Sequence, residues 1–150
     1  MKKVKVLVVA MVCLMLALSL SACIGHIEDT NGDDDFSLVT ITDSDLVSGK
    51  SNSLTNNSMK TTIGNKTTHK YGKFSGIITL ETIRVTTGKT ITTTMSVTAG
   101  NCRLVLVKDG QIVYDFNING SDSVTLESGT YYLRIAGESA KVDSLTYILA

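Results

Sequence analysis

The feature that most constrains the fold is an Asp-Gly pair between two apolar, β-branched runs, in the segment from Arg103 to Phe116. A type I′ turn requires positive φ at both central positions, and Asp109-Gly110 is a sequence that tolerates it, so the segment predicts a two-residue β-hairpin. Both faces of the hairpin carry apolar groups, which predicts a central place in a sheet. The expected register pairs Lys108 with Gln111, Val107 with Ile112 and Val105 with Tyr114.

The rest of the chain from Lys73 onward also has the two-residue period of strands. Apolar Ile91, Met95 and Val97 alternate with threonine and serine, for example, and β-branched threonines favour pleated sheet over helix. A change of parity near Glu81-Thr82 predicts a bulge. About seven short strands separated by turns predict an all-β fold over residues 73–150, a small antiparallel β-sandwich with a small β-barrel as the alternative.

Residues 23–72 are rich in Ser, Thr, Asn, Asp and Gly, and this composition predicts a flexible polar tether. Within the tether, residues 36–41 are apolar and β-branched enough to add a strand to the edge of the domain. Residues 29–35 match the first ligand positions of an EF-hand loop. The match then fails, because Asp34 stands where glycine is required and Thr40 where a bidentate glutamate belongs, so a solvated acidic linker is expected.

The N-terminus has the layout of a signal peptide over residues 1–22. Lysines at positions 2, 3 and 5 precede a 15-residue apolar run, Val6–Leu20. As a helix this run would measure about 22 Å, short of the roughly 30 Å hydrocarbon core of a bilayer. Cleavage is therefore expected, with an uncleaved anchor as the alternative.

The segment Leu20-Ser21-Ala22-Cys23 resembles the lipobox of bacterial lipoproteins. The resemblance implies cleavage between Ala22 and Cys23, a diacylglyceryl group on the Cys23 sulfur, and further acylation of its amine. Two or more acyl chains would hold the protein on a membrane stably, whereas one chain holds a protein only marginally. The expected location is therefore membrane-anchored and extracytoplasmic, at the cell surface or in the periplasm.

Composition narrows the possible partners. The chain has 14 basic and 14 acidic residues and no tryptophan. Such a balance lacks the basic excess typical of nucleic-acid-binding domains, so no nucleic-acid partner is expected. The expected partners are the membrane, through the lipid anchor, and an envelope protein or polysaccharide. Neither a cofactor nor a metal ion is expected.

Few residues are candidates for catalysis. His69 lies among Lys66, Lys70 and Lys73 in a basic cluster that is expected to be a solvated strand edge or to contact an anionic envelope polymer. Cys102 is expected to be a half-buried apolar residue. Three glutamates could act as glycosidase carboxylates, but nothing in their spacing brings two of them together. They are Glu81, Glu127 and Glu138.

The tyrosines are the candidate binding residues, because aromatic rings can stack on a glycan or a peptide. They are Tyr114, Tyr131, Tyr132 and Tyr147. The stretch 122–135, with its Gly129-x-Tyr131-x-Leu133 strand, is similar to accessory β-sandwiches of secreted proteins such as bacterial pre-peptidase C-terminal domains. The sequence thus predicts a lipoprotein that displays a non-catalytic binding domain, with a structural envelope component as the main alternative and a hydrolase as a minor one.

Overall fold

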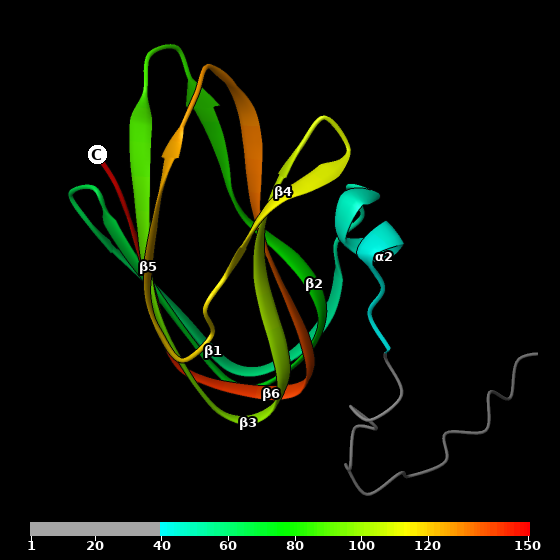
Figure 1. Ribbon diagram of the computed structural model, residues 1–150. Helices are drawn as coiled ribbons and strands as arrows, with labels where there is room; N and C mark the ends of the chain where they lie inside the picture. Colours follow the sequence, from blue (N-terminus) through cyan, green and yellow to red (C-terminus); the bar gives the residue numbers. More distant parts are fainter. Residues whose placement is uncertain (1–39) are drawn as a thin grey trace, which may run out of the picture. The chain divides into compact units, whose positions relative to one another are not determined.

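The computed structural model describes residues 40–150, which form the all-β fold expected from the sequence, together with one short helix that was not expected (Figure 1). The strands are antiparallel and lie in the order β1-β2-β6-β3-β4, and β5 also pairs with β3. The elements are α2 (Asp43–Val47), β1 (Asn52–Ile63), β2 (Lys66–Val85), β3 (Lys89–Lys108), β4 (Gln111–Phe116), β5 (Gly120–Leu126) and β6 (Gly129–Leu149).

Three long, bent strands build the sandwich. β2 and β3 have 20 residues each and β6 has 21, so the expectation of seven short strands is wrong. The first half of β3 pairs with β5 and its second half with β4. One open sheet therefore folds over itself, and its two halves face each other across the core (Figure 1).

The bends occur where side chains are small or φ is positive. Gly76 has φ 110°, Gly100 has φ 70° and Ser139 has φ 51°. A Cβ atom on Gly100 would lie 2.3 Å from the carbonyl oxygen of Ser139, so the crossing of β3 and β6 requires glycine there. The strands bend at these positions and continue beyond them.

The core lies between the two halves of the sheet. Its fully buried members come from β2, β3 and β6, and include Phe74, Ile91, Leu104, Leu133 and Leu145. A second, smaller cluster lies on the outer face of one half, under α2. The sheet thus buries apolar side chains on both faces in this half, and on one face in the other.

The predicted tether is wrong over its second half. β1 and the first part of β2 form a hairpin within residues 52–72, so the domain does not begin at Lys73. Its turn is Gly64-Asn65, with φ 61° at the glycine, as type II′ turns require. The polar composition did not indicate strands here, because this segment pairs through its backbone and its threonines. An example is the 3.1 Å contact between the Thr62 and Thr67 hydroxyls.

The Asp-Gly hairpin is confirmed, with φ 52° at Asp109 and 72° at Gly110. Its register agrees next to the turn but not farther away, because a shift after Val107 makes Leu106, and not Val105, the partner of Tyr114. β4 is an outer strand of the sheet, so only the β3 half of the hairpin is central. The bulge expected at residues 81–82 appears between Thr79 and Glu81.

The predictions for residues 1–39 lie outside the described part of the chain: the signal peptide, the lipobox with Cys23, and the acidic linker. Of the possible edge strand at 36–41, only Thr40 and Ile41 are described, and neither is in a strand. Within residues 40–150, no helix is both long enough and apolar enough to cross a bilayer.

Candidate binding cleft

The helix α2 is short but well capped. Thr42 is its N-cap, and a capping box joins it to Asp45, whose carboxylate accepts from the Thr42 backbone N–H at 2.9 Å and from its hydroxyl at 2.6 Å. These hydrogen bonds lower the pKa of the exposed Asp45 carboxyl. At the other end, the Ser48 hydroxyl donates to the Asp45 carbonyl at 2.9 Å. A five-residue helix needs such local support, because it is too short to be stable alone.

A buried arginine joins the helix to the sheet. Arg134 on β6 is 1% exposed, and its guanidinium donates to the backbone carbonyls of Leu46 and Lys50, at the C-terminal end of α2. Burial lowers the pKa of this arginine. Beside it, the fully buried Leu46 packs on Ile77 and Val105. The C-terminal end of the helix is therefore fixed by a hydrophobic contact and by charge-assisted hydrogen bonds.

Two further contacts hold the start of the segment. Arg103 contacts the carboxylates of Asp43, at 2.6 Å, and Asp115, at 2.7 Å, and so links α2 to β4. The Glu138 carboxylate accepts from the Ile41 backbone N–H at 2.9 Å and from the Asn101 amide at 3.1 Å. Residues 41–50 are thus attached to β3 and β6 at both ends and in the middle.

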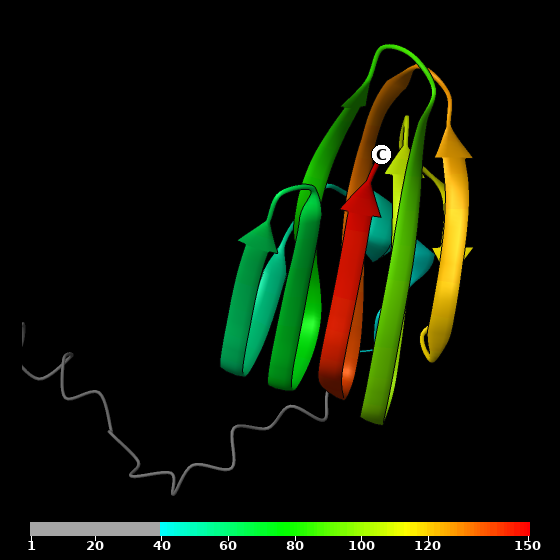
Figure 2. The same cartoon turned by 90° about the vertical axis from the view of Figure 1, so that its left-hand side faces the viewer.

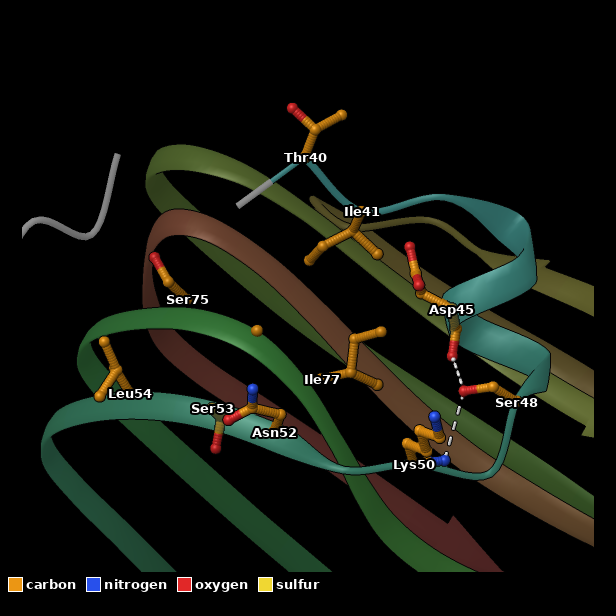
Figure 3. Close-up of a pocket in the computed structure, with 11 residues that line it drawn as sticks. Thr40, Ile41, Asp45, Ser48, Lys50, Asn52, Ser53, Leu54, Ser75 and Ile77 are labelled. Carbon is orange, nitrogen blue, oxygen red and sulfur yellow. Dashed lines mark hydrogen bonds between the residues drawn. The ribbon is translucent and has the colours of Figure 1, made fainter. Parts of the chain in front are cut away.

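Between α2 and the β1–β2 hairpin lies a cleft of about 500 Å³ (Figure 3). Its apolar surface comes from the buried Ile77, the half-buried Ile41 and Leu54, whose side chain is 55% exposed. Its polar lining comes from α2, the start of β1 and β2. These residues are Thr40, Asp45, Ser48, Lys50, Asn52, Ser53 and Ser75.

The cleft has the size and the mixed lining of a ligand site. Gly76 lies in its floor, where a Cβ atom would be 2.1 Å from the Asn52 carbonyl oxygen, so β1 and β2 approach closely there. The Asp45 carboxylate is engaged in the helix cap, so the lining offers Lys50 as a cation and Asn52 as an amide. Hydroxyl groups come from Thr40 and Ser53, whereas the hydroxyls of Ser48 and Ser75 are hydrogen-bonded to backbone groups of Asp45 and Ser139. Such groups can bind and orient a polar or anionic chain beside the apolar side chains of the lining.

The four candidate tyrosines do not form one stacking surface. Tyr131 and Tyr147 are 5% and 2% exposed and belong to the core, while Tyr114 is half-buried and donates to Asp122 at 2.9 Å. Only Tyr132, at 43%, is exposed, and it lines a separate cavity of about 320 Å³ with Arg134. The correction follows from strand alternation, because Tyr131 and Tyr132 point to opposite faces of β6.

His69 is not on a solvated strand edge. It is 6% exposed, its Nδ1 lies 3.2 Å from the Tyr71 hydroxyl, and its ring stacks on those of Tyr71 and Tyr147. Loss of solvation, helped by the charge of Lys60, lowers its pKa to about 4. The expected basic cluster does not form around His69, because side chains alternate between the two faces of β2. The flanking Lys66 and Lys70 are exposed, and His69 faces inward.

This buried imidazole predicts a pH dependence of stability. Its pKa is about 4 in the folded chain and near 6.5 when unfolded. Only the unfolded chain binds the proton between these values, so stability is fully present above pH 6.5 and falls as the pH drops toward 4, at up to about 1.4 kcal/mol per pH unit. Urea unfolding at several pH values checks this. The matched variant His69→Phe should remove most of the slope, and an equal slope in both proteins would contradict the assignment.

The remaining chemical candidates are Cys102 and the three glutamates. Glu81 accepts from the Tyr147 hydroxyl at 3.0 Å, Glu138 binds the segment before α2, and Glu127 is exposed next to the β5–β6 turn. Cys102 is an apolar core residue as expected, but it is buried rather than half-buried, and burial raises the pKa of its thiol to about 12. A thiol with such a pKa is a poor nucleophile. Residues 40–150 contain no group of three or more potential metal ligands.

Comparison with known proteins does not assign the chain to a family. No protein-family model and no curated protein matches the chain. Among solved structures, the Drosophila melanogaster CENP-C cupin domain matches with a TM-score of 0.29 and 12% identity, over 75% of this chain and 84% of that chain. At this TM-score the likeness assigns neither an activity nor a ligand.

The exclusion of nucleic acid as a partner is wrong as inferred. The inference rested on a charge averaged over the whole chain. The charge is locally unbalanced, because residues 50–80 contain five lysines and no Asp or Glu. A balanced total therefore does not exclude a locally basic surface.

The polar composition of residues 40–55 is typical of a tether, so the cleft was not predicted from the sequence. Two signals were present. Thr42 and Asp45 have the three-residue spacing of a capping box, and the apolar Leu46 follows directly. The Gly64-Asn65 pair between β-branched residues is a hairpin signal of the kind recognised at Asp109-Gly110.

Proposed function

We propose that this protein is a lipid-anchored, extracytoplasmic protein whose β domain binds an envelope protein or polymer without catalysing a reaction. The lipobox-like segment ending at Cys23 supports the anchor. The cleft between α2 and the β1–β2 hairpin supports the binding function. Its lining of apolar and polar side chains is the observation that carries the proposal.

The lining of the cleft favours binding over catalysis. It contains no histidine, cysteine or glutamate, and its one carboxylate, Asp45, is held by Thr42. A general acid or base needs a proton-accepting group aimed at the substrate. Lys50 and Asn52 instead suit the recognition of anionic or amide groups, such as those of a peptide or an acidic glycan.

The cleft can be tested through Leu54 and Lys50. Leu54→Ser removes the exposed apolar wall, and Lys50→Ala removes the cation. The full-length chain would be incubated with isolated peptidoglycan, envelope polysaccharide and solubilised envelope proteins, and the captured amount measured against protein concentration. We expect each variant to weaken capture by about tenfold, an effect typical of truncating an interface residue that contributes substantially to the binding energy.

Val113→Ser is the matched control, because Val113 is also an exposed apolar strand residue, 47% accessible on β4, and does not line the cleft. Its capture should equal that of the unchanged chain. Equal capture by all variants would remove the cleft from the proposal. Failure of the unchanged chain to bind any fraction, with normal surface display, would favour a structural role in the envelope.

A further inference from the structure

The strand β1 lies at the outside of the sheet and has the character of an unprotected edge. In the described part of the chain it pairs only with β2. It is 12 residues long and carries a single charge, on Lys60. Two large apolar side chains on its second half are exposed, Met59 by 57% and Ile63 by 75%. Natural edge strands are usually short, charged or covered, because exposed edges pair with other strands.

The other outer strands are better protected. β4 has six residues, and its Asp115 is joined through Arg103 to α2. β5 has seven residues, and Asp122 faces the interior side of its edge, where it is bonded to Tyr114. Buried or inward-facing charge and a covering helix are devices that prevent pairing. Among residues 40–150, β1 is the longest of the three outer strands, and its one charge is carried by the exposed Lys60.

The hairpin geometry shows which backbone groups of β1 face outward. Residues that flank a two-residue turn form a hydrogen-bonded pair, here Ile63 with Lys66. Hydrogen-bonded and non-hydrogen-bonded pairs then alternate along an antiparallel ladder. The backbone groups of Ser58, Lys60 and Thr62 are therefore directed to the open edge, where a further strand can bind them.

We propose that β1 pairs with β1 of a second copy of this chain, antiparallel and with Thr61 on the two-fold axis. Thr61 then faces Thr61 of the other copy in a non-hydrogen-bonded pair. Lys60 and Thr62 exchange backbone hydrogen bonds across the junction. On the outer face, Met59 of each copy lies opposite Ile63 of the other, so the exposed apolar groups cover one another.

Charge and side-chain size select this register. Centring the pair on Lys60 would place two ammonium groups opposite each other, which is destabilising. Centring it on Thr62 would place Met59 opposite the turn residue Asn65 and leave it without an apolar partner. A shift by a single residue would place the outer face of one copy opposite the inner face of the other. A two-fold axis perpendicular to the sheet at Thr61 meets all three requirements.

The junction would also extend a row of hydroxyl groups. Thr61 is aligned across the sheet with residues of four other strands, and the Thr68–Thr146 and Thr94–Ser121 hydroxyl pairs are 3.0 and 3.1 Å apart. In Figure 2 the half of the sheet that contains this row of strands lies in front, with β1 at its left edge. The row consists of Thr61, Thr68, Thr146, Thr94 and Ser121. Pairing at Thr61 continues the row into the second copy.

Cysteine cross-linking tests the register. In the full-length chain, in detergent with micelles in excess over protein, Thr61→Cys should form a disulfide-linked dimer on mild oxidation, because non-hydrogen-bonded pairs bring side chains close together. Thr62→Cys and Ser58→Cys are the controls, since neither residue faces itself in this register. We expect at least fivefold more dimer with Thr61→Cys than with either control or the unchanged chain. Equal yields would overturn the register.

A second variant tests the association itself. Ile63→Lys places a charge opposite Met59, and because Ile63 is 75% exposed the fold should persist. Sedimentation at several concentrations should show a dimer for the unchanged chain and at least tenfold weaker association for Ile63→Lys. Val113→Lys, the same change on β4, should dimerise normally. A monomeric unchanged chain, or equal weakening by both lysine variants, would overturn the proposal.

Discussion

Replacing Arg134 with methionine should lower the free energy of unfolding by about 3 kcal/mol, because it leaves buried backbone carbonyls without their charged donors. The guanidinium is 1% exposed and binds the carbonyls of Leu46 and Lys50, which end α2 and begin the approach to β1. Methionine retains the apolar stem and removes only the donors. Urea unfolding followed by circular dichroism measures the change.

Two controls separate this role from simple loss of charge. Arg134→Lys keeps the charge but not the planar fork that reaches two carbonyls, so it should recover less than half of the lost stability. Arg103→Met breaks ion pairs that are largely exposed, and should cost about 1 kcal/mol or less. A cost for Arg134→Met as small as that for Arg103→Met would contradict the anchoring of α2 by the buried guanidinium.

Replacing Cys23 with alanine should abolish membrane retention, the largest effect that the proposed function predicts. Without the thiol no diacylglyceryl group can be attached, and each buried CH₂ of a lost acyl chain removes about 0.8 kcal/mol of membrane binding. Fractionation of cells into membrane and soluble parts measures this. Cys102→Ala is the control, since that thiol is buried in the domain, and its variant should stay in the membrane fraction.

Local rules predicted the parts of the fold that depend on local sequence. The Asp109-Gly110 turn formed because only a few residue types accept positive φ at both positions. Its register failed three residues from the turn, where Val113 is accommodated by a shift. Such a shift depends on how β3 packs between β4 and β6, which a single segment does not encode.

The bent strands could not be predicted from local patterns. Residues 97–101 and 136–139 contain glycine, alanine, asparagine and serine, which are typical of turns. In the structure they bend because Gly100 passes within van der Waals distance of the Ser139 backbone. That contact joins strands that are distant in the sequence. Tertiary packing therefore determines whether such a segment forms a turn or a bend within a strand.

The candidate cleft was missed for the same reason. The segment from Thr40 to Leu54 is polar, and polarity alone suggested a tether. Its order comes from distant partners on β3 and β6, namely Arg103, Arg134 and Glu138. The error for the tyrosines was the opposite one. Tyr131 and Tyr147 were expected to bind a partner, but they fill the core that their strands create.

The mass of the mature N-terminus shows whether Cys23 is the lipid-modified first residue. The protein would be extracted from its native membrane, digested, and its N-terminal peptide measured by mass spectrometry. We expect a chain that starts at Cys23 and carries the mass of a diacylglyceryl group, with or without an additional acyl chain. A chain that starts at Met1, carries no acyl mass and is recovered from the cytosol would contradict this expectation.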